Sequence, residues 1–262
     1  KISNIVLNLN INLNYNALPD FETDCLGIYI NEYNEKTINE LNSIIKKIKH
    51  NTLQFFITFK ISNINLKSII KAFSKLSHVH LLFVNKNCTE IIGGVVVTYN
   101  HLENFINRDN LTINLKLYTE SQKHNTYYNR KLFIGAKGEI KNSTEAPKIF
   151  GNINDLNQTD NILKIINSIE FQKYWFINKD LIDVCKQCEF RYMCVDNRVP
   201  IQRNNKEWFM ETECNYNPYI AKWQDEEGYK TLTECGITSN QDGFKINRKK
   251  LNAINKELLG ND

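Results

Sequence analysis

The sequence predicts an α/β fold in which a partial (βα) barrel-like parallel sheet is followed by a cysteine-rich lobe that binds a metal cluster. Three observations support this prediction. Apolar runs alternate with amphipathic helices over the first 85 residues, this rhythm changes after residue 90, and three cysteines fall within residues 183–198. Hydrophobic residues make up 42% of the 262 residues and charged residues 24%, which is ordinary for a globular protein.

The first part of the chain alternates strand and helix patterns. Strands are predicted at residues 4–10, 26–31, 53–59 and 79–84, and helices at residues 37–49 and 65–76. In the first helix the apolar residues recur at helical spacing: Ile38, Leu41, Ile44, Ile45 and Ile48. Short connections between such elements imply parallel strands with right-handed crossovers, either in an open sheet or in part of a barrel.

The second part of the chain has a different pattern. Strands are predicted at residues 93–99 and 111–119, and helices at residues 161–176 and 248–259. A hairpin that turns at Ala136, Lys137 and Gly138 is predicted at residues 130–142. We therefore divide the chain into a βα domain at 1–120, a cysteine-rich domain at 121–235 and a tail with a short helix at 236–262.

Charge and hydropathy exclude some partners. The formal charge is +4, and the lysines are scattered apart from short runs such as "KKIK" at 46–49, so no nucleic-acid partner is expected. No apolar run reaches the roughly 18 residues of a membrane span, and no charged-then-apolar leader precedes a cleavage site. We expect a cytoplasmic protein without a membrane partner, and the oligomeric state stays open. The chain begins at Lys1 rather than a methionine, which is compatible with a fragment of a longer protein.

The strongest chemical signal is the spacing Cys-x2-Cys-x5-Cys at Cys185, Cys188 and Cys194. Seven cysteines, an odd number with tight grouping, argue against a secreted disulfide framework. Two cysteines separated by two residues present both sulfurs to one centre when the chain turns tightly between them, and the third can follow on the next loop. A redox Cys-x-x-Cys dithiol is the weaker alternative, because it leaves Cys194 unexplained.

A four-coordinate centre needs a fourth ligand, for which Cys214 and Cys235 are candidates. Cys214 is better placed, because Asn217 and Pro218 predict a turn beside it. Cys235 is the reserve ligand. The two remaining cysteines, Cys25 and Cys88, are most simply packed or idle thiols.

Several motifs resemble one known family. "GEIKN" (138–142), "FGNIND" (150–155), "YWFINKDLIDVCKQCEFRYMCVDNR" (174–198) and "CNYNPY" (214–219) resemble the SPASM region of radical SAM/SPASM peptide maturases. They look most like the maturase of the grasp-with-spasm peptide-modification systems. The matching motifs run from about residue 125 to 223, and the βα half fits the family's partial barrel more loosely.

The resemblance implies a ligand set. SPASM domains usually hold two auxiliary [4Fe–4S] clusters, and the ligands of the first are carried over as Cys185, Cys188, Cys194 and Cys214. At three positions where the family tends to have cysteines for the second cluster, this sequence has Tyr127, Ser143 and Asn197. Since these residues leave no thiolate cage, we expect one [4Fe–4S] cluster rather than two. Zn²⁺ is the alternative, because four thiolates satisfy it equally well.

A second departure concerns the chemistry. Radical SAM enzymes hold their SAM-cleaving cluster at Cys-x3-Cys-x2-Cys near the first barrel strand, and no three cysteines here have that spacing; Cys25 stands by itself. We expect an iron-sulfur protein that acts in the maturation of a ribosomally synthesised peptide without radical SAM chemistry of its own. Its expected partners are a precursor peptide and an ATP-grasp ligase. The alternatives are a redox or radical maturase that uses the auxiliary cluster, and a zinc-stabilised scaffold without catalysis.

Charged and aromatic residues surround the cysteines. Arg191, Tyr192, Asp196 and Arg198 would either bind a peptide carboxylate and orient the ligands or form ion pairs that fix the loop. We favour the ion pairs, in which Glu189 or Asp196 meets Arg191, Arg198 or Lys179. The three tryptophans are predicted to pack against the same lobe: Trp175, Trp208 and Trp223.

Overall fold

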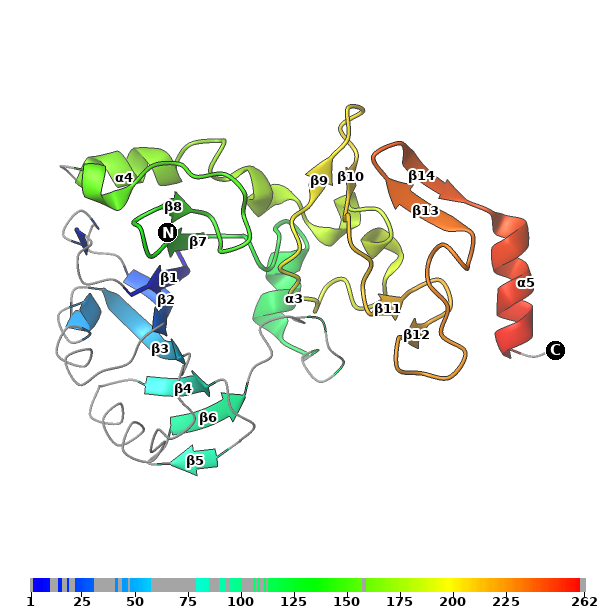
Figure 1. Cartoon of the computed structure of the whole chain (residues 1–262), viewed down its shortest axis with the longest axis horizontal. Coiled ribbons are helices and arrows are strands. Elements are labelled where there is room, and N and C mark those ends of the chain that lie inside the picture. The colour runs from blue at the N-terminus through cyan, green and yellow to red at the C-terminus, as the bar shows by residue number, and fades with distance from the viewer. Residues whose placement is uncertain are drawn as a thin grey trace. The chain divides into compact units, whose positions relative to one another are not determined.

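A computed structural model of the chain (Figure 1) describes residues 2–9, 14–15, 18, 22–30, 41, 44–46, 48–57, 79–84, 90–92, 95–99, 106, 108, 111, 113–156 and 159–259. The chain forms two compact units that alternate along the sequence. Unit 1 comprises Lys1–Glu103 and Arg130–Gln172, and unit 2 comprises Asn104–Asn129 and Lys173–Asp262. The sequence-based division at residues 120 and 235 stays a prediction.

Unit 1 contains an eight-stranded sheet with the order β5-β6-β4-β3-β2-β1-β7-β8. Its strands are β1 (Asn4–Asn8), β2 (Glu22–Ile30), β3 (Lys49–Ile57), β4 (Val79–Val84), β5 (Glu90–Ile92), β6 (Val95–Tyr99), β7 (Lys131–Ile134) and β8 (Ile140–Lys141). The strands from β6 to β7 in this order pair in parallel, while β5 and β8 pair antiparallel at the two edges. An α/β fold with a mostly parallel sheet is therefore confirmed.

Alternating burial fixes the register in the middle of this sheet. Ile5 and Leu7 of β1 are fully buried and stand opposite Leu26 and Ile28 of β2. A shift by one residue would turn these side chains toward the other face, so the register is strongly specified.

The two helices predicted between these strands are described only in part. The helix predicted at 65–76 lies outside the described residues, as does Ile38 of the first helix. Of the remaining residues on the predicted apolar face, Leu41, Ile44, Ile45 and Ile48 are buried, as predicted.

The predicted hairpin at 130–142 is confirmed as β7 and β8. Its turn requires glycine at residue 138, which has φ +90° and where a Cβ atom would come within 2.5 Å of the side-chain oxygen of Asn152. The helix predicted at 161–176 is shorter in the structure than predicted, where α4 spans Thr159–Ile166. The Ser168 hydroxyl ends it by donating to the Ile165 carbonyl and accepting from the Phe171 N–H.

The strand predicted at 111–119 is wrong, since α3 spans Leu115–Ser121 in unit 2. The side chain of Asn114 accepts a hydrogen bond from the Leu117 N–H at 3.1 Å and so caps the helix. The period-two pattern had suggested a half-buried strand, but Ile113 and Leu115 are 95% and 80% exposed. Within the described part of the chain no sheet face covers them, so local capping decides the conformation.

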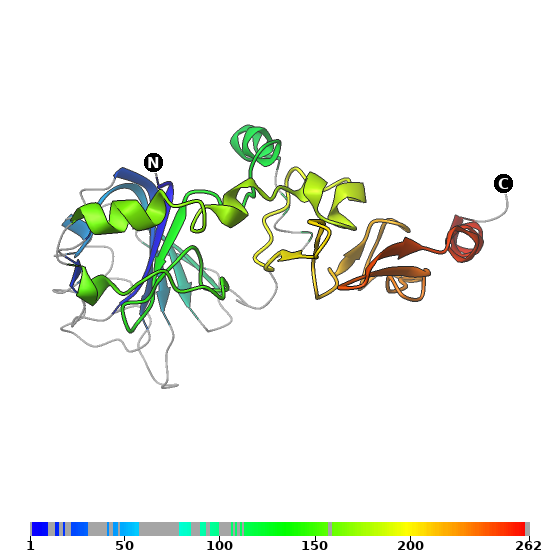
Figure 2. The ribbon, with the colours of Figure 1, turned by 90° about the horizontal axis from the view of Figure 1, so that it is seen from above.

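Unit 2 is built from short elements. In addition to α3 they are η4 (Lys173–Phe176), η5 (Lys179–Leu181), η6 (Cys185–Gln187), β9 (Ile201–Gln202), β10 (Trp208–Phe209), β11 (Tyr216–Asn217), β12 (Lys222–Trp223), β13 (Ile237–Asn240), β14 (Gly243–Ile246) and α5 (Arg248–Leu259). The strands form antiparallel pairs β9–β10, β11–β12 and β13–β14. The predicted final helix at 248–259 is confirmed as α5, which Figure 2 shows end-on beyond the β13–β14 hairpin.

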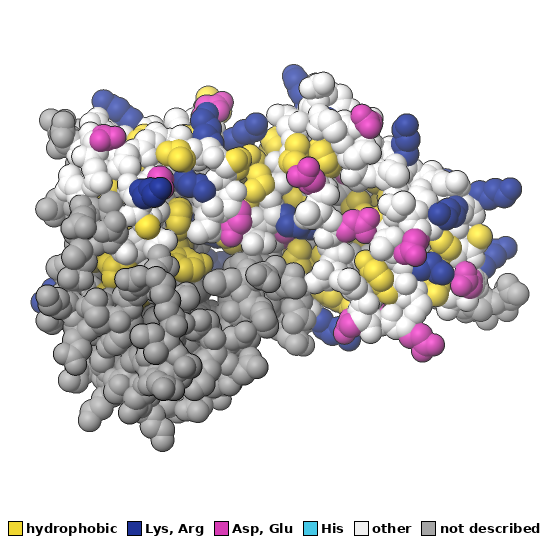
Figure 3. Space-filling view, viewed as in Figure 1, with side chains coloured by type: hydrophobic (Ala, Val, Ile, Leu, Met, Phe, Trp, Pro, Cys, Tyr) yellow, Lys and Arg dark blue, Asp and Glu magenta, His cyan; other side chains and the backbone are white. Residues whose placement is uncertain are grey.

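Charges are interspersed on the described surface. On the face drawn in Figure 3, Lys and Arg side chains lie among Asp and Glu side chains, which agrees with the scattered pattern of the sequence. Among the described helices, none has the length and apolar character needed to cross a bilayer.

Candidate metal centre

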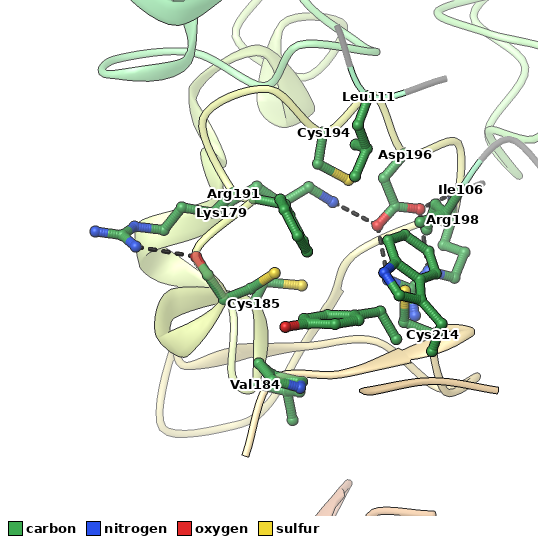
Figure 4. A pocket seen from close by; sticks show the side chains of 15 residues that line it. Ile106, Leu111, Lys179, Val184, Cys185, Arg191, Cys194, Asp196, Arg198 and Cys214 are labelled. Atoms are coloured by element: carbon green, nitrogen blue, oxygen red, sulfur yellow. Dashed lines mark hydrogen bonds and ion pairs between the residues drawn. The ribbon is translucent and has the colours of Figure 1, made fainter. Parts of the chain in front are cut away.

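The structure brings the four predicted ligands to one cavity in unit 2 (Figure 4). Cys185, Cys188, Cys194 and Cys214 all line this cavity, which we call the cysteine cavity and which has a volume of about 40 Å³. Cys188, Cys194 and Cys214 each lie within electrostatic reach of Cys185. The four cysteines therefore line a common space, and their predicted role as ligands of one metal centre stays a prediction.

A tight turn presents the first two sulfurs. The Cys185 N–H donates to the Asp183 carbonyl at 2.8 Å, and the Cys188 N–H donates to the Cys185 carbonyl at 2.9 Å. Between them η6 makes a single turn, and Val184 before it has φ 67°. Because a β-branched residue rarely adopts a positive φ, the backbone is strained where the turn begins.

The geometry leaves the kind of metal centre open. Within the described ranges, no group of three or more His, Cys, Asp or Glu side chains is placed so that it could hold a metal ion. One [4Fe–4S] cluster, with Zn²⁺ as the alternative, stays a prediction.

Three of the cavity thiols, those of Cys188, Cys194 and Cys214, are protonated at neutral pH without a metal. Burial raises the pKa of Cys188 to about 12 and raises the pKa values of Cys194 and Cys214 above their usual range. Metals and clusters bind the thiolate, so their binding releases these protons.

Alkylation tests this protonation state. Iodoacetamide is expected to react with Cys188 and Cys194 of the metal-free chain at pH 8 at least about a hundredfold more slowly than with free cysteine. The rate at Cys188 should rise as the pH approaches 12. Peptide mass mapping over a time course measures both rates, and the urea-unfolded chain is the control, in which all thiols should react at the free rate. Reaction of the folded chain within tenfold of free cysteine would contradict the prediction.

A buried ionic network lies beside the sulfurs. The side chain of Asp196 is 0% exposed and accepts from Lys179 Nζ at 2.5 Å and from Arg198 Nη2 at 2.7 Å. These pairs confirm the predicted ion pairing of the loop. Lys179 and Arg198 carry two positive charges against the one negative charge of Asp196, so the network leaves one positive charge next to the thiols.

The pKa values in this network follow from its pairing. Burial by itself would lower the pKa of Lys179, but attraction to Asp196 outweighs burial and raises it. Burial by itself would raise the pKa of Asp196, but Lys179 and Arg198 outweigh burial and hold it below its usual range. All three groups of the network are therefore charged at neutral pH.

Aromatic rings close one side of the cysteine cavity. Phe190, Tyr216 and Trp223 line it, and the centroids of the last two rings are 4.9 Å apart. The Tyr216 hydroxyl donates to the Glu189 carboxylate. Of the predicted tryptophans, Trp223 therefore lines the cavity. Trp208 packs instead in a separate apolar cluster.

Part of the lining of the cysteine cavity was not predicted from the sequence. Ile106 and Leu111 line the cysteine cavity, and Arg108 between them pairs with Asp225 at 3.2 Å and Glu226 at 3.1 Å. These contacts join segments more than 100 residues apart, and no local pattern near residue 108 indicated them.

The other cysteines lie elsewhere. Cys235, the reserve ligand, is fully buried in the apolar cluster beneath α5 and accepts a hydrogen bond from Asn217 Nδ2 at 3.4 Å. It does not line the cysteine cavity. Cys25 lies on β2 in unit 1, where burial raises its pKa to about 11, and Cys88 lies outside the described residues.

The three non-cysteine positions are part of the packed structure. Tyr127 is buried, with its ring centroid 5.1 Å from that of Tyr128. The Asn197 carbonyl accepts from the Tyr128 hydroxyl at 2.7 Å, and in unit 1 the fully buried Ser143 hydroxyl accepts from the Ala146 N–H at 3.1 Å. The loss of a second cluster at these positions stays a prediction.

Comparison with known proteins leaves the family open. No family model, curated protein or solved structure matches the chain. Any assignment of function therefore depends on the cysteine cavity, the charges beside it and the motifs in the sequence.

Proposed function

We propose that the chain is an iron-sulfur protein of the SPASM type that acts in the maturation of a ribosomally synthesised peptide. One [4Fe–4S] cluster would be held by Cys185, Cys188, Cys194 and Cys214. The observation that carries the proposal is the meeting of these four thiols, from residues 185–214, at one cavity.

The residues around the thiols fit such a group. Four thiolates and a [4Fe–4S] core carry net negative charge, and the network of Lys179, Asp196 and Arg198 supplies one compensating positive charge within a buried setting. Phe190, Tyr216 and Trp223 supply an apolar cover that limits access of water. When bound, the cluster would supply a cross-link for the lobe and a one-electron carrier.

The residues of the chain itself would bind and present the peptide. Because the sequence contains no Cys-x3-Cys-x2-Cys motif, we place the bond-forming chemistry on a partner ATP-grasp ligase rather than on this chain. The parallel strands β6-β4-β3-β2-β1-β7 would correspond to the family's partial barrel, and unit 2 to its SPASM lobe. Both correspondences belong to the proposal.

Metal analysis tests the proposal. Chain purified without oxygen is expected to contain about four irons and four sulfides, with the visible absorption of an iron-sulfur cluster. About one zinc without sulfide would replace the proposal by a structural zinc module. About eight irons would mean that Tyr127, Ser143 and Asn197 do not mark a lost cluster.

A further inference from the structure

A second cavity adjoins the cysteine cavity in unit 2. This polar cavity has a volume of about 170 Å³, and the two cavities share Val184, Cys185, Arg198 and Cys214 in their linings. A molecule bound in the polar cavity would therefore lie next to two of the proposed ligands.

Two continuous chain segments form part of its wall. Residues 210–214, after β10, and residues 237–240, which are all of β13, line it without a gap. Side chains on one face of a strand alternate, so a cavity over the face of β13 would touch every second residue. Lining by consecutive residues indicates that the cavity runs along the edge of β13.

That edge has hydrogen-bonding capacity to offer. Among the described strands, β13 pairs with β14 in a two-stranded sheet. In an antiparallel pair, alternate residues direct their backbone N–H and C=O groups away from the partner strand. The Ile237 N–H already donates to the Leu232 carbonyl at 2.8 Å, and the Asn240 carbonyl accepts from Arg203 Nε at 2.6 Å. An extended chain that enters the polar cavity would find the remaining outward groups of β13.

Two carboxylates of the lining stand outside its ion pairs. Arg198 pairs with Asp196, and Asp183 pairs with Arg203 at 2.5 Å and with Lys186 at 2.8 Å. Among the described residues, Glu211 and Glu213 form no ion pair, and the Glu213 carboxylate accepts a hydrogen bond from the Leu232 N–H at 3.2 Å. Two exposed carboxylates therefore remain for a cationic group of a ligand.

We propose that the polar cavity binds an extended, basic peptide segment as an added strand along β13, with a Lys or Arg side chain against Glu211 and Glu213. Identifying this peptide with the precursor depends on the proposed function, whereas the binding itself does not. The peptide would then be held beside the cysteine cavity.

Peptide binding to the full chain tests the inference. The probe is a fluorescein-labelled octapeptide of alternating Thr and Lys, and its fluorescence anisotropy is measured at low salt. The Glu211→Lys/Glu213→Lys variant is expected to bind it about tenfold more weakly, because two attractive contacts become repulsive. The control is Glu22→Lys/Glu227→Lys, which changes the charge equally at exposed positions outside the cavity and should bind within twofold of the wild type.

A second probe separates strand addition from attraction between charges. The same octapeptide with N-methyl groups on alternate backbone nitrogens cannot donate to β13, and it should bind at least about tenfold more weakly. Equal binding of the methylated peptide, or equal binding by the two double variants, overturns the inference.

The two proposals can fail independently. Iron and sulfide measured on the same preparations should be unchanged in the Glu211→Lys/Glu213→Lys variant. Four irons without peptide binding would remove this inference and leave the proposed function. Peptide binding without iron or sulfide would remove the proposed function and leave the peptide site.

Discussion

Replacement of Cys194 by serine is expected to reduce the iron content of anaerobically purified chain from about four per chain to below one and to abolish its visible absorption. A serine hydroxyl is a poor ligand for iron at neutral pH, and three thiolates hold a [4Fe–4S] cluster less firmly than four. The backbone should stay in place, because the Cys194 carbonyl accepts from the Thr126 hydroxyl at 2.7 Å whatever its side chain.

Cys235→Ser is the matched control for this experiment. Cys235 is a buried thiol of the same unit that does not line the cysteine cavity, so its replacement should leave the iron content near four. Equal loss in both variants would point to general damage rather than to a ligand role. Iron retained in Cys194→Ser would exclude this residue from the ligand set.

The same pair of variants tests the partner. In an assay with an ATP-grasp ligase and its precursor peptide, the chain with Cys235→Ser should support peptide modification and the chain with Cys194→Ser should not. Modification by the ligase at the same rate without the chain would remove the basis for a presenting role.

Replacement of Asp196 by alanine is expected to lower the free energy of unfolding of unit 2 by about 3–5 kcal/mol, because it leaves two buried cations without their anion. The three tryptophans of the chain all lie in unit 2, so urea titration followed by tryptophan fluorescence reports on this unit. The pKa of Asp196 is held below its usual range, so its contribution is complete at neutral pH and is lost as the pH falls below about 4. That loss should be absent from the variant.

Asp225→Ala provides the contrast. Asp225 also pairs with an arginine, but its side chain is 79% exposed, and such pairs contribute less than about 1 kcal/mol. If both variants lose less than about 1 kcal/mol, the Lys179–Asp196–Arg198 network does not stabilise the unit.

Local signals account for what the sequence predicted about the site. The turn between Cys185 and Cys188 is formed by hydrogen bonds between residues close in sequence. The spacing of the two cysteines was therefore enough to predict the turn. The turn after Cys214 was also predicted correctly. Asn217 accepts from the Tyr219 N–H at 3.0 Å and donates to the Lys230 carbonyl at 2.8 Å, which fixes the chain just beyond the sulfur.

Long-range packing accounts for what the sequence did not predict. The approach of Arg108 to Asp225 and the polar cavity between residues 210–214 and 237–240 depend on segments that carry no shared local pattern. The same limit explains residues 111–119, whose alternation is typical of a strand. A strand needs a partner, and alternation by itself does not say whether the fold provides one.

The distribution of the four cysteines along the chain has a consequence for the stability of the loop between them. Cys185 and Cys214 are separated by the β9–β10 hairpin, so a group bound to both closes a loop of about 30 residues. A permanent cross-link of that length lowers the entropy of the unfolded chain by the equivalent of about 3–4 kcal/mol. The secondary structure within the loop consists of one helical turn and two strands of two residues each, which contribute little cooperativity of their own. Under the proposed function, the stability of this loop would therefore increase when iron and sulfide are available to form the cluster.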